Sequence, residues 1–204
     1  MRNRDLGLET WGVATPTGVT YPCSVTAPQV RSATTKTPSL TAAVKILATL
    51  KKTLKDNDPK IGSAMNNLAL AYSSVNRHSE ALQLKKETLQ FFQRVLPGND
   101  VRIGKAMYNL AFTYTGLNRH SEAVDMGEAT LYFFTETAKL KSVHSDVLDT
   151  MNNLVLAYIG LGKYRKALQM AKKLLTLYKK NSSPHSDIVA ITKYVDALEG
   201  IHES

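Results

Sequence analysis

Apolar residues recur along the chain with the spacing of a helix. In the stretch "AMNNLALAY", four of them stand at positions i, i+3, i+4 and i+7, namely Met65, Leu68, Ala69 and Tyr72. This spacing places the four side chains on one side of a helix and predicts that this side is buried. Asn66 and Asn67 interrupt the apolar stretch, although asparagine is a poor helix former. Either these amides are simply exposed to solvent, or they make a specific contact on that side of the helix.

The same pattern returns twice further along the chain. "AMNNLALAYSSVNRHSEAL" begins at Ala64, "AMYNLAFTYTGLNRHSEAV" begins 42 residues later at Ala106, and "TMNNLVLAYIGLGKYRKAL" begins 44 residues after that at Thr150. The short segments that precede them also repeat, as "DPKIG", "DVRIG", "HSDVL" and, once more, "HSDIV". A period of this length indicates a stack of equivalent helical units that bury their faces against one another.

Each unit is expected to be a hairpin of two helices, which we name helix A and helix B. In the first unit, helix A is predicted over residues 59–74, with Asp58 as N-cap and Pro59 at the first helical position. Helix B is predicted over residues 79–96. The turn between them contains Asn76, which becomes Asn118 and Gly162 in the later units. Asparagine and glycine share easy access to the left-handed conformation that ends a helix, so this turn is expected there.

These units resemble the tetratricopeptide repeat. The resemblance rests on the Leu–Ala–x–x–Tyr of helix A and the alanine that opens helix B, with one departure at Val155. The usual repeat of that family is shorter, and the longer unit with "NNLA", "EAL" and a partly kept "H-x-D" lead-in resembles the kinesin light chain subfamily. The resemblance implies an all-α fold, a right-handed solenoid of antiparallel helical hairpins. No heptad segment precedes the repeats, so the coiled coil that joins a light chain to its motor is expected to be missing.

The repeats divide the chain into regions. Full repeats are expected at residues 58–99, 100–143 and 144–184, within an array that spans residues 40–200. Residues 40–57 align with a helix B and form a partial repeat, residues 185–200 form a capping helix, and residues 201–204 are a tail. Residues 1–39 are rich in Thr and Ser, hold four prolines and show no helical period. We interpret them as a flexible arm, with an organellar transit peptide as the alternative.

Composition and charge exclude some classes of protein. A hydrophobic fraction of 43% and a charged fraction of 21% are typical of a globular protein, and no apolar stretch is long enough to span a bilayer. Of the net charge of +9, residues 1–56 carry +5 and the remaining residues +4, without a dense Lys/Arg stripe. Binding of nucleic acid through the basic arm is therefore the least favoured hypothesis. The single cysteine, Cys23, fits a reducing compartment, so we expect a cytoplasmic protein.

The sequence does not indicate an enzyme. His78 and His120 occupy equivalent places in successive units, as do His144 and His185, so they are expected about a repeat apart and not around one metal ion. No Cys-x-x-Cys pair, glycine-rich phosphate loop or Gly-x-Ser-x-Gly motif occurs in the sequence. We expect no catalytic residue, no metal site and no cofactor.

The resemblance implies that the A helices line a concave groove. The side of helix A that lies beside the buried stripe then supplies the candidate peptide-binding residues, which are Asn66, Asn67, Leu70, Lys105, Tyr108, Asn109, Phe112, Asn152, Asn153 and Leu156. The equivalent asparagines 67, 109 and 153 have two interpretations. They either hydrogen-bond neighbouring helices and set the twist of the stack, or they pair with the main chain of an extended peptide.

Specificity for the peptide would come from the side chains between these asparagines. Tyr108 and Phe112 offer an apolar platform, whereas Lys105 and Arg102 suit an acidic residue. The resemblance implies a peptide that carries an aromatic residue among acidic ones. Our prediction is a non-enzymatic adaptor that binds a peptide segment of a partner protein. The alternative is an assembly module, a homo-oligomer or part of a longer array, whose incomplete ends stack on another copy or on further repeats.

Overall fold

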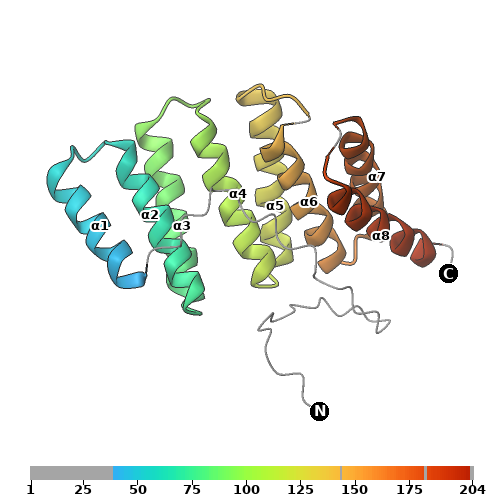
Figure 1. Ribbon diagram of the computed structural model, residues 1–204, viewed down its shortest axis with the longest axis horizontal. Helices are drawn as coiled ribbons and strands as arrows, with labels where there is room; N and C mark the ends of the chain where they lie inside the picture. Colours follow the sequence, from blue (N-terminus) through green and yellow to red (C-terminus); the bar gives the residue numbers. More distant parts are fainter. Residues whose placement is uncertain (1–38, 143, 182, 203–204) are drawn as a thin grey trace, which may run out of the picture. The chain divides into compact units, whose positions relative to one another are not determined.

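The computed structural model describes residues 39–142, 144–181 and 183–202. The predicted flexible arm, apart from Ser39, lies outside the described residues, as do residues 203–204 of the predicted tail. The described part is helical throughout, with eight α-helices and one π-helical segment (Figure 1). They are α1 (Leu40–Thr53), α2 (Pro59–Ser74), α3 (His78–Val95), α4 (Val101–Gly116), α5 (His120–Tyr132), η1 (Phe133–Thr137), α6 (Ser145–Gly160), α7 (Tyr164–Lys180) and α8 (His185–His202). The predicted all-α solenoid of helical hairpins is confirmed.

The helices begin at the caps that the repeated lead-in segments supply. The side chain of Asp58 accepts a hydrogen bond from the backbone N–H of Lys60 at 2.8 Å, and Asp100 accepts one from Arg102 N–H at 2.9 Å. At the start of α6, His144 takes this role, with its Nδ1 accepting from Asp146 N–H at 3.2 Å. These side chains satisfy N–H groups that the first turn of a helix leaves free.

The turns between the helices of each hairpin use a left-handed residue, as the repeat predicts. Asn76 has a φ of 59°, Asn118 of 56° and Gly162 of 69°. The backbone N–H of the next residue then returns to the last turn of helix A, for example from Arg77 to the carbonyl of Tyr72 at 3.0 Å. This pattern satisfies carbonyl groups that would otherwise be orphaned at the helix end.

Within the first two full repeats, helix A and helix B meet at a glycine. A Cβ placed on Gly62 of α2 would lie 2.4 Å from the ring of Phe92 on α3, and one on Gly104 of α4 would lie 2.3 Å from the ring of Phe134. Only a residue without a side chain allows the aromatic ring to come this close to the backbone of helix A. The third repeat solves the same contact differently, with buried Leu148 at the glycine position.

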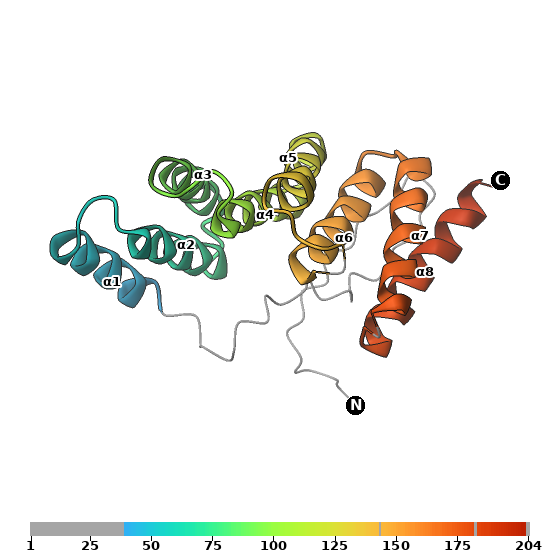
Figure 2. The ribbon, with the colours of Figure 1, turned by 90° about the horizontal axis from the view of Figure 1, so that it is seen from above.

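Successive repeats stack because each helix B packs against the helix A that follows it. The pairs are α1 with α2, α3 with α4, α5 with α6, and α7 with α8, and α4 also packs against α6. Figure 2 shows α3 and α5 on one side of the array and α2 and α6 on the other. The core therefore runs along the stack, and each A helix is buried on the sides that face its two neighbouring B helices.

The longer spacing between the second and third repeats is absorbed in the segment after η1, because seven residues (138–144) precede α6, whereas five residues (96–100) precede α4. Before this segment, the end of α5 widens into η1, where the backbone N–H of Ala138 donates to the carbonyl of Phe133, five residues earlier, at 2.8 Å. Lys139 then takes a φ of 55° and turns the chain out of the helix. α5 and η1 together span as many residues as α3, so the buried Phe133 and Phe134 keep the places of Phe91 and Phe92 in the core. Among the described helices, none has the length and apolar character needed to cross a bilayer.

Candidate functional site

The predicted groove residues lie on α2, α4 and α6, on a surface that we call the A-helix face. Three of them occupy equivalent places in the repeat, Leu70 on α2, Phe112 on α4 and Leu156 on α6. All three are half-buried, whereas the core residues of the same helices are fully buried. One partly exposed apolar side chain per repeat therefore marks this face, and the spacing between them is set by the stacking of the repeats.

The middle repeat adds a second aromatic ring to the A-helix face. Tyr108 stands one turn before Phe112, and the two rings are stacked with centroids 6.2 Å apart and planes at 26°. Burial raises the pKa of the Tyr108 hydroxyl, and the nearby carboxylates of Asp149 and Asp146 raise it further. The hydroxyl therefore stays protonated at neutral pH, and it lies in acidic surroundings.

The cations predicted to receive an acidic peptide residue have carboxylate partners within the protein. The Lys105 ammonium lies 3.5 Å from Asp146 on α6. Arg102 donates from Nε and Nη2 to the two carboxylate oxygens of Asp100, at 2.9 Å and 2.6 Å. These contacts reduce the positive charge that the sequence alone ascribes to this face, so the aromatic and apolar side chains are its stronger feature.

The equivalent asparagines have three different environments. Asn67 is exposed, Asn109 is half-buried and Asn153 is only 3% exposed. Asn109 Nδ2 donates to Asn66 Oδ1 at 3.1 Å, a hydrogen bond that joins α4 to α2. Asn109 thus bonds a neighbouring helix, as the first interpretation requires, although its partner is Asn66 and not the equivalent Asn67.

Asn152 and Asn153 are buried, although a groove wall would leave them accessible. The reason is that α6 packs against α4 in addition to α5 and α7, while α2 and α4 approach each other less closely. Within the described residues, neither side-chain atom of Asn153 has a hydrogen-bond partner. A buried amide without partners lowers stability by on the order of 1–3 kcal/mol per unpaired group. Asn153 therefore destabilises α6.

A cavity lies away from the A-helix face, between α1, α2 and α3. Its volume is about 860 Å³, with Ile61, Met65 and Phe91 providing its apolar part. Two bases, Lys51 and Arg94, and two acids, Asp56 and Glu87, stand around it. Because both signs of charge are present in equal number, the cavity has no preference for an anion or a cation.

Two of the histidines, His144 and His120, make structural contacts. His144 caps α6, as described above, and the His120 ring packs directly on Gly160, where a Cβ would lie 2.3 Å from Nδ1. Burial lowers the pKa of His120 below its ordinary value. Within the described ranges, no group of three or more His, Cys, Asp or Glu side chains is arranged to hold a metal ion.

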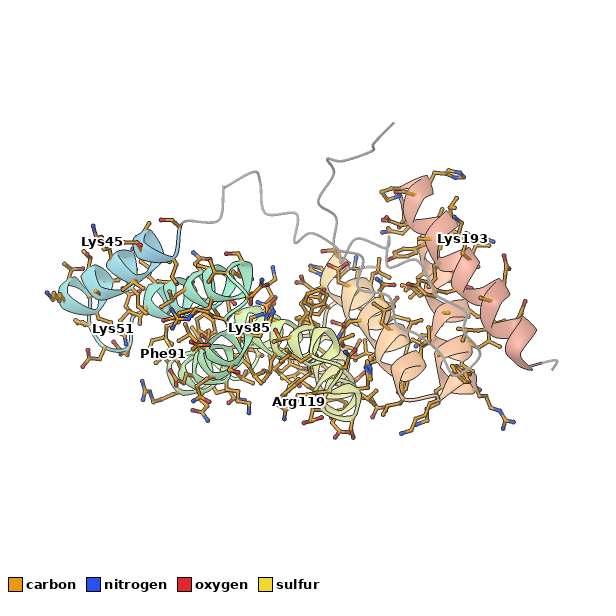
Figure 3. The ribbon with its side chains drawn as sticks, turned by 90° about the horizontal axis from the view of Figure 1, so that it is seen from below. Lys45, Lys51, Lys85, Phe91, Arg119 and Lys193 are labelled. Atoms are coloured by element: carbon orange, nitrogen blue, oxygen red, sulfur yellow. The ribbon has the colours of Figure 1, made fainter. Side chains whose placement is uncertain are left out.

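A buried lysine escaped the sequence analysis. Lys85 on α3 (Figure 3) is 5% exposed. Its ammonium donates to Thr113 Oγ1 on α4. Burial lowers the pKa of Lys85 to about 8. The sequence did indicate that Lys85 is buried, because the equivalent positions of the other repeats hold small residues, Ala43, Gly127 and Ala171.

Comparisons with known proteins place this geometry in a family. Family models described as "Tetratricopeptide repeat" match residues 63–136 and 147–186, which together make up more than half of the chain. No curated protein matches the chain at a significant level.

Solved structures share the fold. Two are crystal structures of putative kinesin light chain nearly identical TPR-like repeats from Podosopora anserina. One is 19% identical with a TM-score of 0.69, over 80% of this chain and 77% of that one. The other is 18% identical with a TM-score of 0.61, over 80% and 86% of the two chains. BtubC (BKLC) from P. vanneervenii is 20% identical with a TM-score of 0.63, over 72% of this chain and 57% of its own length.

The matches agree with the hairpins, turns and stacking described above. The repeats are similar in fold to kinesin light chain-like repeats, as the sequence predicted. The chain belongs to the tetratricopeptide repeat family, and its helical array is a protein-interaction scaffold.

Proposed function

We propose that this protein is a non-enzymatic adaptor that binds an extended segment of a partner protein on its A-helix face. The observation that carries the proposal is the series Leu70, Phe112 and Leu156, equivalent positions that stay half-exposed in three successive repeats. Apolar side chains at a regular spacing suit alternate side chains of an extended peptide. The stacked Tyr108 and Phe112 rings add an aromatic surface to this series and would anchor an aromatic or aliphatic side chain.

The amides beside this series supply contacts to the peptide main chain. Asn67 is exposed, and the Asn66–Asn109 pair keeps donor and acceptor capacity after its mutual hydrogen bond. Peptide N–H and C=O groups bind to such amides whatever the side chains of the peptide are. The paired state of Lys105 and Arg102 weakens the case for an acidic peptide, so we place the preference on apolar and aromatic residues. A single cysteine suits a reducing, cytoplasmic setting.

A peptide array tests the proposal directly. The full chain is applied to an immobilised degenerate library of short linear peptides, and the captured sequences are compared with those captured by Phe112→Ala. Loss of a central aromatic anchor is expected to weaken capture about tenfold or more. Asn67→Ala combined with Asn109→Ala is expected to weaken capture of all peptides alike, because these two accessible amides contact the peptide main chain.

The control is Tyr132→Ala, which removes an aromatic ring that is 66% exposed on α5 and lies outside the A-helix face. This variant is expected to capture the library like the unchanged chain. Circular dichroism and thermal unfolding establish that each variant keeps its helices. Normal capture by folded Phe112→Ala, or equal loss in Tyr132→Ala, contradicts the proposal.

A further inference from the structure

Helix α1 exposes an apolar face that is buried in every full repeat. By the repeat alignment it is a helix B, and Ile46 stands where the full repeats have Thr88, Thr130 and Leu174. Those three side chains are at most 1% exposed, whereas Ile46 is 47% exposed. Among the described helices, α1 packs substantially only against α2, so the side on which a full repeat carries its own helix A is open.

Helix α8 has no helix B of its own among the described helices. It is a helix A, and its packing partner among the described helices is α7 of the preceding repeat. Val189 occupies the place of Gly62, Gly104 and Leu148, which are buried against their own helix B, yet Val189 is 37% exposed. Asp196 is exposed at the place of Ala69, Ala111 and Val155, all of which are 0% exposed. The side on which a helix B would pack is therefore open.

The two open faces carry apolar side chains at matching places of the repeat. In the first and second full repeats, the glycine of helix A faces the ring of Phe92 or Phe134 on helix B. The equivalent residues at the two ends of the array are Val189 on α8 and Leu50 on α1. We propose that α8 of one copy packs against α1 of a second copy, so that the two helices form a complete A–B hairpin between chains.

Charge favours the same pairing. Helix α1 contains Lys45, Lys51 and Lys52 and no acidic residue. Helix α8 contains Asp187 and Asp196 against Lys193, and its third acid, Glu199, is paired with Lys172 of α7 at 2.6 Å. Figure 3 shows Lys45 and Lys51 on α1 and Lys193 on α8, at opposite ends of the helical array. Opposite net charges steer the unlike ends together, and like charges disfavour α1 on α1 or α8 on α8.

This arrangement is heterologous, because the two copies use different surfaces. One copy keeps a free α8 and the other a free α1 after they bind, so association continues along a line. A single helix face is small compared with a standard interface, which predicts weak association that depends on concentration and falls with salt.

The experiment uses two variants of the full chain, Ile46→Asp and Val189→Asp, with sedimentation equilibrium from about 1 μM to about 1 mM, a range that covers weak dissociation constants. The unchanged chain is expected to increase in average mass with concentration, and each variant alone is expected to stay monomeric. A mixture of the two is expected to form a one-to-one heterodimer and no larger species, because only one intact pair of faces remains. Val75→Asp, an exposed apolar residue in the turn after α2, is the control and should associate like the unchanged chain.

Circular dichroism checks that the variants fold, which is expected because the replaced side chains are exposed. An unchanged chain that stays monomeric over the whole range overturns the proposal. Either single variant associating as strongly as the unchanged chain, or a mixture that remains monomeric, overturns it as well.

Discussion

Two junctions between repeats have the same backbone design and different chemistry at their centres. At the α3–α4 junction, Lys85 meets Thr113, and the threonine Oγ1 in turn donates to the carbonyl of Asn109 at 2.7 Å. At the α5–α6 junction, the equivalent positions hold Gly127 and Ala157, both buried. A Cβ on Gly127 would lie 2.7 Å from Leu154 Cδ2, so the helix B backbone there rests directly on an apolar side chain of α6.

The last residues of α4 and α6 also differ in how closely they are packed. Gly160 at the end of α6 is covered by the ring of His120, whereas a Cβ on Gly116 at the end of α4 would meet nothing within 4 Å. The second junction is therefore closely packed, while the first is wider and holds a buried amine. One repeat sequence can thus produce junctions of different tightness, depending on which side chain stands at a single central position.

The largest effect is expected from giving the tight junction the residue of the wide one. Gly127→Lys forces a long side chain against Leu154 and buries an amine, so the free energy of unfolding should fall by about 3 kcal/mol or more. Urea denaturation followed by circular dichroism measures the change.

Gly98→Lys is the matched control for that substitution, because nothing lies within 4 Å of a Cβ there. Its free energy of unfolding should change by no more than about 0.5 kcal/mol. A Gly127→Lys variant as stable as this control would show that the tight junction can open without cost.

A second prediction concerns the buried amine of the wide junction. Burial lowers the pKa of Lys85 from 10.5 to about 8, so the folded state carries an unfavourable charge below pH 8. As the pH rises from 8 to 10.5, the unfolded state binds more protons than the folded state, and stability therefore increases. Lys85→Met is expected to be more stable than the unchanged chain by about 3 kcal/mol at pH 7, and this advantage should shrink towards pH 10.5.

The difference between the two proteins isolates Lys85, because the tyrosines titrate in both of them. Burial raises the pKa values of Tyr108 and Tyr178, which lowers stability above pH 10 to the same extent in each. Lys173→Met, which replaces an exposed lysine on α7, is the control and should show no such pH-dependent difference. If the difference in the free energy of unfolding between Lys85→Met and the unchanged chain stays constant from pH 7 to 10.5, the pKa of Lys85 is not lowered by burial.

The smallest effect is expected from the two glycines at the ends of the junctions. Gly160→Ala puts a Cβ 2.3 Å from the His120 ring and should lower the free energy of unfolding by about 1 kcal/mol as that ring is displaced. Gly116→Ala meets no neighbour and should raise it by about 0.5 kcal/mol, since alanine is the better helix former. Thermal unfolding of both variants gives the comparison, and a change of the same sign in both would remove the distinction between the two ends.

Much of the fold was predictable because its signals are local. The range predicted for the first helix A, residues 59–74, is the range of α2, and the residues of the left-handed turns were identified by the interchange of Asn and Gly. The longer spacing before the third repeat was visible in the sequence, but the π-helical end of α5 was not. A π-type turn depends on how the end of a helix packs, and no local pattern of residues shows that.

The candidate site was less predictable. The sequence placed Asn67, Asn109 and Asn153 in equivalent positions, yet the structure leaves the first exposed and buries the last. It also pairs Lys105 with Asp146, which lies 41 residues further along the chain. Such differences arise between repeats, where the approach of two helices depends on side chains that no local pattern relates.

The sequence by itself determined the helices, their caps, their left-handed turns and the repeat family, because each of these depends on residues within a few positions of one another. Only the tertiary structure decided which copies of a repeated residue are buried, which charges are paired and how tightly each junction closes. Those outcomes depend on contacts between helices of different repeats, where one substitution, such as Lys85 for a small residue, changes which side chains meet at the centre of a junction.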